Sequence, residues 1–219
     1  MNEVAVWGFR WVPPFAQGLV RDLRVRWALR EAGLPYETRL IGVEERTSAA
    51  HRRRHPFGMV PVLEADGRLL TESGAIVYAI AKRSAALMPE DEAGRDRTLA
   101  WMFAALNTVD PPVQALFDID VSHGAETWAR SRRPDIVKAV EVRLGELADA
   151  LGGRDHLLGR FTAADILMVT VLRFIRHTEL VAARPALAAY VARCEARPAF
   201  GEALGEQMAE YALNAPAAA

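Results

Sequence analysis

The sequence predicts a small α/β domain followed by an all-helical domain. Three observations predict this fold class. Over roughly the first 85 residues, short β-rich runs alternate with helix-like runs, as in an α/β unit. The dipeptide Asp66-Gly67 separates two apolar runs and is typical of a tight β-hairpin. Beyond about residue 90 the apolar residues recur with helical spacing, and no further strand is expected.

The α/β part begins with an apolar strand at 3–8. The helix expected at 19–33 ends with Gly33, which suits the position after a helix because it tolerates a left-handed backbone. A half-buried strand at 36–41 and a weaker helix at 45–55 follow.

The hairpin strands are expected at 61–65 and 68–71. The helix that follows, at 72–84, has Ser73 as its expected N-cap. The predicted order is therefore βαβ, then a helix, then ββα.

The remaining chain is expected to be helical. Helices are predicted at 96–117, 132–153 and 161–177, with one or two more over 185–206. The first contains Pro111 and Pro112 at a bend, because proline interrupts helical hydrogen bonding. Thr162 and Asp165 have the spacing of a capping box, with aspartate as the acidic member. The predicted domains are residues 1–84 and 95–219, joined by a linker at 85–94.

The composition limits the class of protein. The chain has 219 residues, of which 51% are hydrophobic and 25% charged, with a formal net charge of -1. Nucleic-acid-binding proteins usually have a strong basic excess, so no nucleic-acid partner is expected. No apolar run is long enough to cross a bilayer, and the first residues lack a secretory signal pattern. Cys194 is the one cysteine and is expected to be a buried, inert thiol, and a cytoplasmic location is predicted.

The stretch 58–76 is the first candidate for a binding site. If the Val60-Pro61 bond is cis, the Val60 backbone can face outward and pair with an extended peptide ligand. Ser73 and the first N–H groups of its helix can bind an anion, and Glu72 can hold an ammonium group. These groups fit a ligand end that carries an α-amino and an α-carboxylate group. The alternative is that Ser73 is only a helix cap and Glu72 only a surface charge.

Several phrases of the sequence carry a family resemblance. They are "REAGLPYE" at 30–37, "HPFGMVPVL" at 55–63, "ESGAI" at 72–76 and the T-x-x-D cap of the helical half. Together and in this order they resemble the glutathione transferase family over essentially the whole chain. The resemblance implies a thioredoxin-like first domain and a helical second domain. It also implies a cis Pro61, a Val60 backbone that pairs with the cysteinyl part of glutathione, and a γ-glutamyl end held by Glu72 and Ser73.

The sequence departs from the family at two places. Family members usually stabilise the glutathione thiolate with a Ser, Tyr or Cys, but the matching position holds Val20, Arg21 or Asp22. Arg21 is the candidate catalytic residue, because a nearby guanidinium favours a thiolate. The alternative is that Arg21 and the arginines after it form a solvated face. Met59 is the second departure, since many relatives carry a polar residue at this place in the glutathione site.

Other residues are weaker candidates. Trp11, Phe15, Phe103 and Asn107 are candidates for a pocket that binds the second substrate, or for ordinary packing. A buried Asn107 would need a hydrogen-bond partner, or would serve the kink at Pro111. The run 52–55 either approaches the glycyl carboxylate of glutathione or is a solvated helix end. His51 and His55 are four residues apart, but the arginines between them disfavour a cation, so no metal is expected.

The expected function is therefore that of a glutathione transferase. Glutathione is the expected co-substrate, and its thiolate would attack a small, apolar electrophile. The alternatives are a non-catalytic protein of the same fold that binds glutathione or a partner, and a glutathione-dependent isomerase, dehalogenase or peroxidase. By resemblance the protein is expected to be a homodimer, and no membrane partner is expected.

Overall fold

The computed structural model describes residues 3–216. These residues form two compact units: 3–87 together with 197–216 make the first, and 88–196 make the second. The boundary at 87/88 falls within the predicted linker 85–94. The predicted all-helical domain 95–219 differs from the second unit at both ends, because the unit already begins at residue 88 and the last helix of the chain belongs to the first unit.

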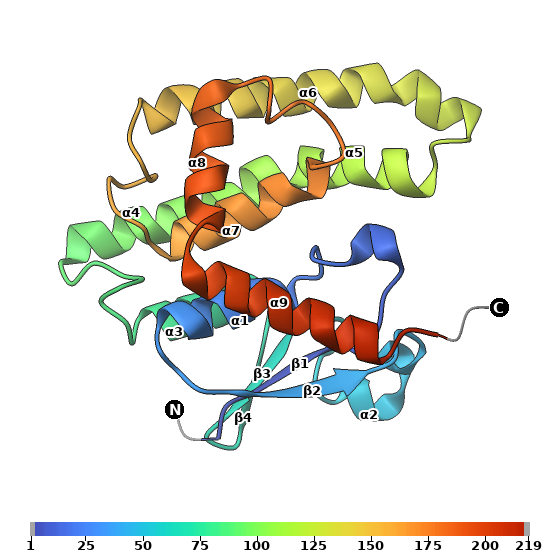
Figure 1. The fold of residues 1–219 in the computed structure, drawn as a ribbon, viewed down its shortest axis with the longest axis vertical. Helices are drawn as coiled ribbons and strands as arrows, with labels where there is room; N and C mark the ends of the chain where they lie inside the picture. Colours follow the sequence, from blue (N-terminus) through green and yellow to red (C-terminus); the bar gives the residue numbers. More distant parts are fainter. Residues whose placement is uncertain (1–2, 217–219) are drawn as a thin grey trace. The chain divides into compact units, whose positions relative to one another are not determined.

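The first unit is built on a four-stranded sheet (Figure 1). Its strands are β1 (Ala5–Phe9), β2 (Glu37–Ile41), β3 (Val62–Ala65) and β4 (Arg68–Thr71). Their order is β2-β1-β3-β4, in which only the β1 and β2 pair is parallel. Asp66 and Gly67 join β3 to β4 with φ of 53° and 70°, as a type I′ turn requires. The sequence predicts all four strands, to within two residues at each end.

The helices of the first unit are α1 (Asp22–Glu31), α2 (Ala49–Arg52), α3 (Ser73–Ala81) and α9 (Pro198–Leu213). Gly33 ends α1 as predicted, with a φ of 65°, and the N–H of Leu34 donates to the Leu29 carbonyl at 2.9 Å. The weak helix predicted at 45–55 is instead two short pieces, the 3-10 helix η2 (Glu44–Thr47) and α2. The extended backbone of Ser48 separates them, because Ser48 serves as the N-cap of α2.

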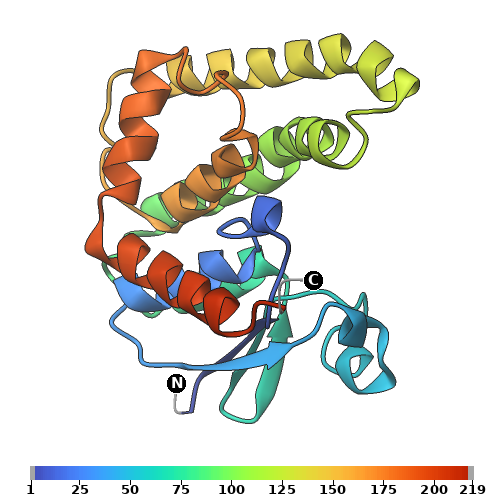
Figure 2. The same cartoon turned by 45° about the vertical axis from the view of Figure 1, so that its right-hand side comes forward.

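Helix α9 lies alongside α1, as Figures 1 and 2 both show. The rings of Trp27 and Phe200 meet edge to face, 4.8 Å apart between centroids. Arg197 Nε donates to Glu31 Oε1 at 2.5 Å. Because these contacts join the two helices, α9 completes the first unit although it comes last in the sequence.

The second unit is helical throughout. Its elements are α4 (Glu92–Phe103), η3 (Ala104–Val109), α5 (Asp110–Ser122), α6 (Thr127–Leu151), α7 (Ala163–Leu172), η4 (Arg173–Ile175) and α8 (Pro185–Glu195). The predicted helix 96–117 is α4 and α5 with a π-helical stretch, η3, between them. Pro111 and Pro112 lie in the first turn of α5. Because proline has no N–H, neither residue can donate a helical hydrogen bond to the preceding turn, and that turn takes the wider π-helical form.

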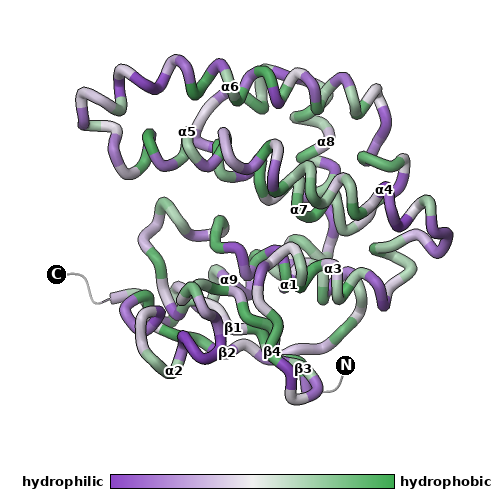
Figure 3. The backbone as a smooth tube through the Cα atoms, turned by 180° about the vertical axis from the view of Figure 1, so that it is seen from behind, coloured by the Kyte–Doolittle hydropathy of each residue, from purple (hydrophilic) through white to green (hydrophobic). Residues whose placement is uncertain are grey.

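The capping box predicted at the start of α7 is present. Asp165 Oδ2 accepts from the Thr162 N–H at 2.8 Å, and Thr162 holds the N-cap position. Every residue of α7 is buried, and the helix is largely green in the hydropathy colouring of Figure 3, whereas α6 carries much purple. Helix α7 is therefore the core helix of its unit. Among the described residues, no helix combines the length and the apolarity that crossing a membrane requires.

Candidate functional site

The segment Met59–Val60–Pro61 brings the first predicted feature of the site. The Val60-Pro61 peptide bond is cis, as the resemblance implies. Val60 is only 8% exposed. Within residues 3–216, neither its N–H nor its carbonyl has a hydrogen-bond partner. Buried backbone groups are nearly always paired, so this N–H and this carbonyl are suited to a ligand.

The start of α3 brings the second feature. Glu72 occupies the N-cap position with a φ of 68°, which is uncommon for a residue with a side chain. Ser73 is therefore not the N-cap that the sequence predicts but the first residue of the helix. Its hydroxyl oxygen accepts from the Arg24 guanidinium at 3.2 Å. Ser73 is thus not a helix cap, because its side chain pairs with a buried arginine, and its role in binding a ligand stays a prediction.

A cavity of about 140 Å³ in the first unit joins these features. It is lined by Arg21, His55, Met59, Val60, Pro61, Glu72 and Ser73. The structure thus brings together the five residues predicted to bind glutathione and the candidate catalytic residue. His55 also lines the cavity, although the sequence indicated it only as the end of the run 52–55 and as half of a disfavoured metal pair with His51.

Two buried histidines support the wall of this cavity. His51 Nε2 lies 2.9 Å from the Met59 carbonyl oxygen. His55 Nδ1 accepts from the Phe57 N–H at 3.3 Å. Burial lowers the pKa of His55, Glu72 opposes this effect, and His51 adds to it. Each histidine thus forms a hydrogen bond, through one ring nitrogen, with the backbone of the segment 57–59 that precedes Val60.

Two of the arginines in α1 are buried, so the solvated-face alternative is wrong for them. Arg24 and Arg26 are 1% and 0% exposed. Arg26 Nε pairs with Asp22 at 2.8 Å, and its Nη2 donates to Glu210 of α9 at 2.6 Å. Burial raises the pKa of Asp22, although Arg26 acts against it. Arg21, by contrast, is partly exposed and lines the cavity.

The side chains predicted for the second substrate belong to different units. Trp11 and Phe15 lie in the first unit, and Phe15 is 54% exposed. Phe103 and Asn107 lie in the second unit, and both are exposed. Asn107 is therefore not the buried amide that would need a partner, and it lies in the π-helical stretch η3. The role of these four residues in binding a second substrate stays a prediction.

One group of possible metal ligands lies in the second unit, formed by His156, Asp165 and Cys194. Asp165 Oδ1 already accepts from the Leu157 N–H and the Tyr190 hydroxyl, both at 3.0 Å. Cys194 is buried, as predicted, and its sulfur lies 3.7 Å from His156 Nδ1. The Asp165 carboxylate thus serves the capping box and its neighbours, and we assign no ion to this group.

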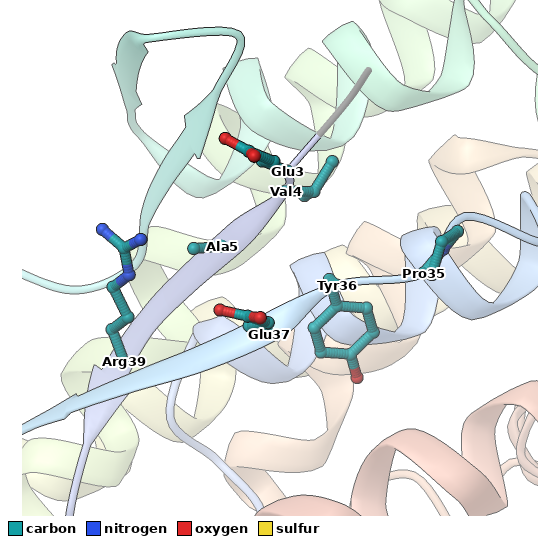
Figure 4. A pocket seen from close by; sticks show the side chains of 7 residues that line it. All are labelled: Glu3, Val4, Ala5, Pro35, Tyr36, Glu37 and Arg39. Atoms are coloured by element: carbon teal, nitrogen blue, oxygen red, sulfur yellow. The ribbon is translucent and has the colours of Figure 1, made fainter.

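A second, more open cavity of about 490 Å³ lies at the start of the sheet (Figure 4). Figure 4 shows its side chains, which come from the beginning of the chain and from the segment around β2: Glu3, Val4, Ala5, Pro35, Tyr36, Glu37 and Arg39. Arg39 is paired with Glu64 at 2.6 Å, and the Tyr36 hydroxyl donates to Glu206. None of the predicted site residues lines this cavity.

Comparison with known proteins agrees with the geometry. The family pattern described as "Glutathione S-transferase, N-terminal domain" matches residues 23–87, and the C-terminal domain pattern matches residues 121–198. A maleylacetoacetate isomerase from Rhizobium meliloti is 30% identical in an alignment that covers 82% of this chain and 89% of that protein. Glutathione S-transferase 4 from Zea mays is 30% identical over 80% of this chain and 83% of its own length.

Solved structures show the same fold. A glutathione transferase from Burkholderia graminis, described with two glutathione molecules bound per subunit, superposes with a TM-score of 0.81 at 26% identity. The match covers 93% of this chain and 88% of that one. The expected thioredoxin-like first domain and helical second domain are thereby confirmed. Since the two family patterns together cover more than half of the sequence, the chain belongs to the glutathione S-transferase family.

Proposed function

We propose that the protein binds glutathione in the cavity of the first unit and promotes attack of its thiolate on a small, apolar electrophile. The unpaired backbone N–H and carbonyl of the buried residue Val60, which lines the cavity, are the observation that carries the proposal. The cysteinyl residue of glutathione offers one N–H and one carbonyl, which complement the Val60 carbonyl and N–H.

The start of α3 supports the same ligand. Glu72 provides a carboxylate for the γ-glutamyl ammonium group, and the first N–H groups of α3 provide an anion site for the γ-glutamyl carboxylate. The protein's contribution to the reaction is then to bind glutathione, to stabilise its thiolate and to orient it toward the second substrate.

Retention on immobilised glutathione tests the binding site. Glu72→Ala removes the carboxylate that pairs with the ligand's ammonium group, so retention should fall at least about tenfold, the factor that corresponds to about 1.4 kcal/mol. Glu90→Ala is the matched control, because Glu90 is exposed and lies outside the cavity. Equal retention of the wild-type protein and the Glu72 variant would contradict the site.

A glutathione-dependent isomerase is the second candidate, favoured by the 30% identical relative that bears an isomerase name. In such a reaction the thiolate adds to a conjugated double bond, rotation follows, and elimination returns both the double bond and the thiolate. Glutathione is therefore not consumed. With a cis-configured conjugated diacid as probe, we expect the cis form to disappear while the titrated thiol concentration stays constant. A loss of one thiol per substrate would instead assign the transferase reaction.

A further inference from the structure

His51 is placed to act on the ligand-binding backbone without touching the cavity. It is 1% exposed, at the end of the short helix α2, and its own N–H donates to Ser48 Oγ at 3.1 Å. Its Nε2 lies 2.9 Å from the Met59 carbonyl oxygen. Because a carbonyl only accepts, Nε2 carries the proton and donates this hydrogen bond. Within the described part of the chain, the buried Nδ1 has no partner.

The hydrogen bond to Met59 fixes more than one carbonyl. The Met59 carbonyl and the Val60 N–H belong to the same planar peptide unit, which is trans, since the cis bond is the next one along. In a trans peptide the C=O and the N–H point in opposite directions. Holding the carbonyl toward His51 therefore turns the Val60 N–H away from His51.

The residues on both sides limit any other orientation. Gly58 has a φ of 64°, and a Cβ there would lie 2.5 Å from the Arg46 carbonyl oxygen, so the turn before Met59 has little room to move. After Val60, Pro61 leads directly into β3, where Val62 pairs with Trp7 and Thr71. The Met59-Val60 peptide is thus a single peptide unit between two fixed segments. His51 supplies the side-chain hydrogen bond to this unit.

We propose that His51 is a positioning residue, which aims the Val60 N–H at the cysteinyl carbonyl of glutathione. The inference rests on the proposed function, in which the Val60 N–H and carbonyl form hydrogen bonds with the cysteinyl residue of glutathione. It assigns to His51 a role in affinity for the part of glutathione that carries the cysteinyl carbonyl, and no role at the γ-glutamyl end.

Three substitutions separate this role from simple structural support. His51→Gln keeps a neutral N–H donor near the place of Nε2, whereas His51→Asn carries the same amide on a shorter side chain that falls short of Met59. His51→Leu removes the donor altogether. We expect the Leu and Asn variants to bind glutathione up to about tenfold more weakly, the factor that one hydrogen bond provides, and the Gln variant to bind within about twofold of the wild type.

A truncated ligand gives the decisive comparison. γ-Glutamylethylamide keeps the amino-acid end and the first amide N–H of glutathione but has no cysteinyl carbonyl. Its inhibition constant against glutathione should be equal in all four proteins. In the Leu and Asn variants, KM for glutathione should rise, while kcat at saturating glutathione should change by less than about twofold. The lost hydrogen bond weakens binding in the ground state and in the transition state equally, and such a loss raises KM without lowering kcat.

The possible outcomes are distinct. Unchanged glutathione affinity in the Asn and Leu variants overturns the inference. It is also overturned if these variants lose affinity equally for glutathione and for γ-glutamylethylamide and the Gln variant does not restore it. If the Leu variant does not fold, the Asn and Gln variants carry the same comparison. Failure of the wild-type protein to bind glutathione, or retention by Glu72→Ala, overturns the proposed function itself and this inference with it.

Discussion

At the scale of single residues, Ser73 is held by Arg24, and this contact bears on the role proposed for Ser73 in binding the ligand. Arg24 is 1% exposed and donates to the Ser73 hydroxyl oxygen at 3.2 Å. Because the oxygen accepts this bond, the hydroxyl proton remains to be donated to a ligand carboxylate. The buried guanidinium also adds positive charge behind the N-terminus of α3, where the helix already favours an anion.

Arg21 is the residue on which the question of catalysis depends. A guanidinium that lines the cavity favours the charged form of a bound thiol, so the bound glutathione thiol should have a pKa below the free value of about 8.5. Arg21→Ala should raise the pKa of the bound thiol by about one unit or more. The ultraviolet absorbance of the thiolate, followed against pH in the complex, measures this pKa.

The control for this titration is Arg10→Ala. Arg10 lies just after β1, outside the cavity, and pairs at the surface with Glu45 at 3.4 Å, so its removal should leave the pKa of the bound thiol unchanged. An unshifted thiol pKa in the wild-type complex would instead favour the non-catalytic binding protein.

At the scale of elements, α1 and α9 are joined by both buried and exposed ion pairs. Arg26 is fully buried between Asp22 and Glu210, whereas the Arg30 side chain is 38% exposed and pairs with Glu206. A buried ion pair that loses one partner leaves an uncompensated charge, but an exposed pair contributes little. The two arginines thus differ in energetic weight although they lie one turn apart.

Methionine substitutions test this difference. Arg26→Met should lower the free energy of unfolding by about 3–5 kcal/mol, because Asp22 and Glu210 lose their common partner in a buried site. Arg30→Met, the matched control on the same helix, should cost less than about 1 kcal/mol. Urea denaturation followed by circular dichroism measures both. Similar losses for the two variants would mean that the burial of Arg26 carries no special cost.

At the scale of the whole molecule, the sequence is sufficient wherever the signal is local. The Asp66-Gly67 turn, the end of α1 at Gly33 and the Thr162–Asp165 capping box each depend on residues within a few positions, and the structure confirms all three. The family resemblance in addition predicts the cis bond before Pro61, and it singles out residues that the structure places in the lining of the first unit's cavity.

The features that the sequence does not predict depend on distant partners. Arg26 looks solvated in sequence because Glu210, its second partner, lies 184 positions away. The membership of α9 in the first unit is hidden for the same reason. His51 looked like half of a weak metal motif, since only the fold brings Met59 to its ring. The homodimer and the cytoplasmic location stay predictions.

The discontinuous first unit has a consequence for how the protein is made. During synthesis, residues 88–196 leave the ribosome before α9. Until α9 has emerged, the charged side chain of Arg26 lacks its partner Glu210. Domains generally fold as units while the chain emerges. The second unit can therefore fold before the first is complete, and the cavity that we propose for glutathione lies in the unit that is completed last.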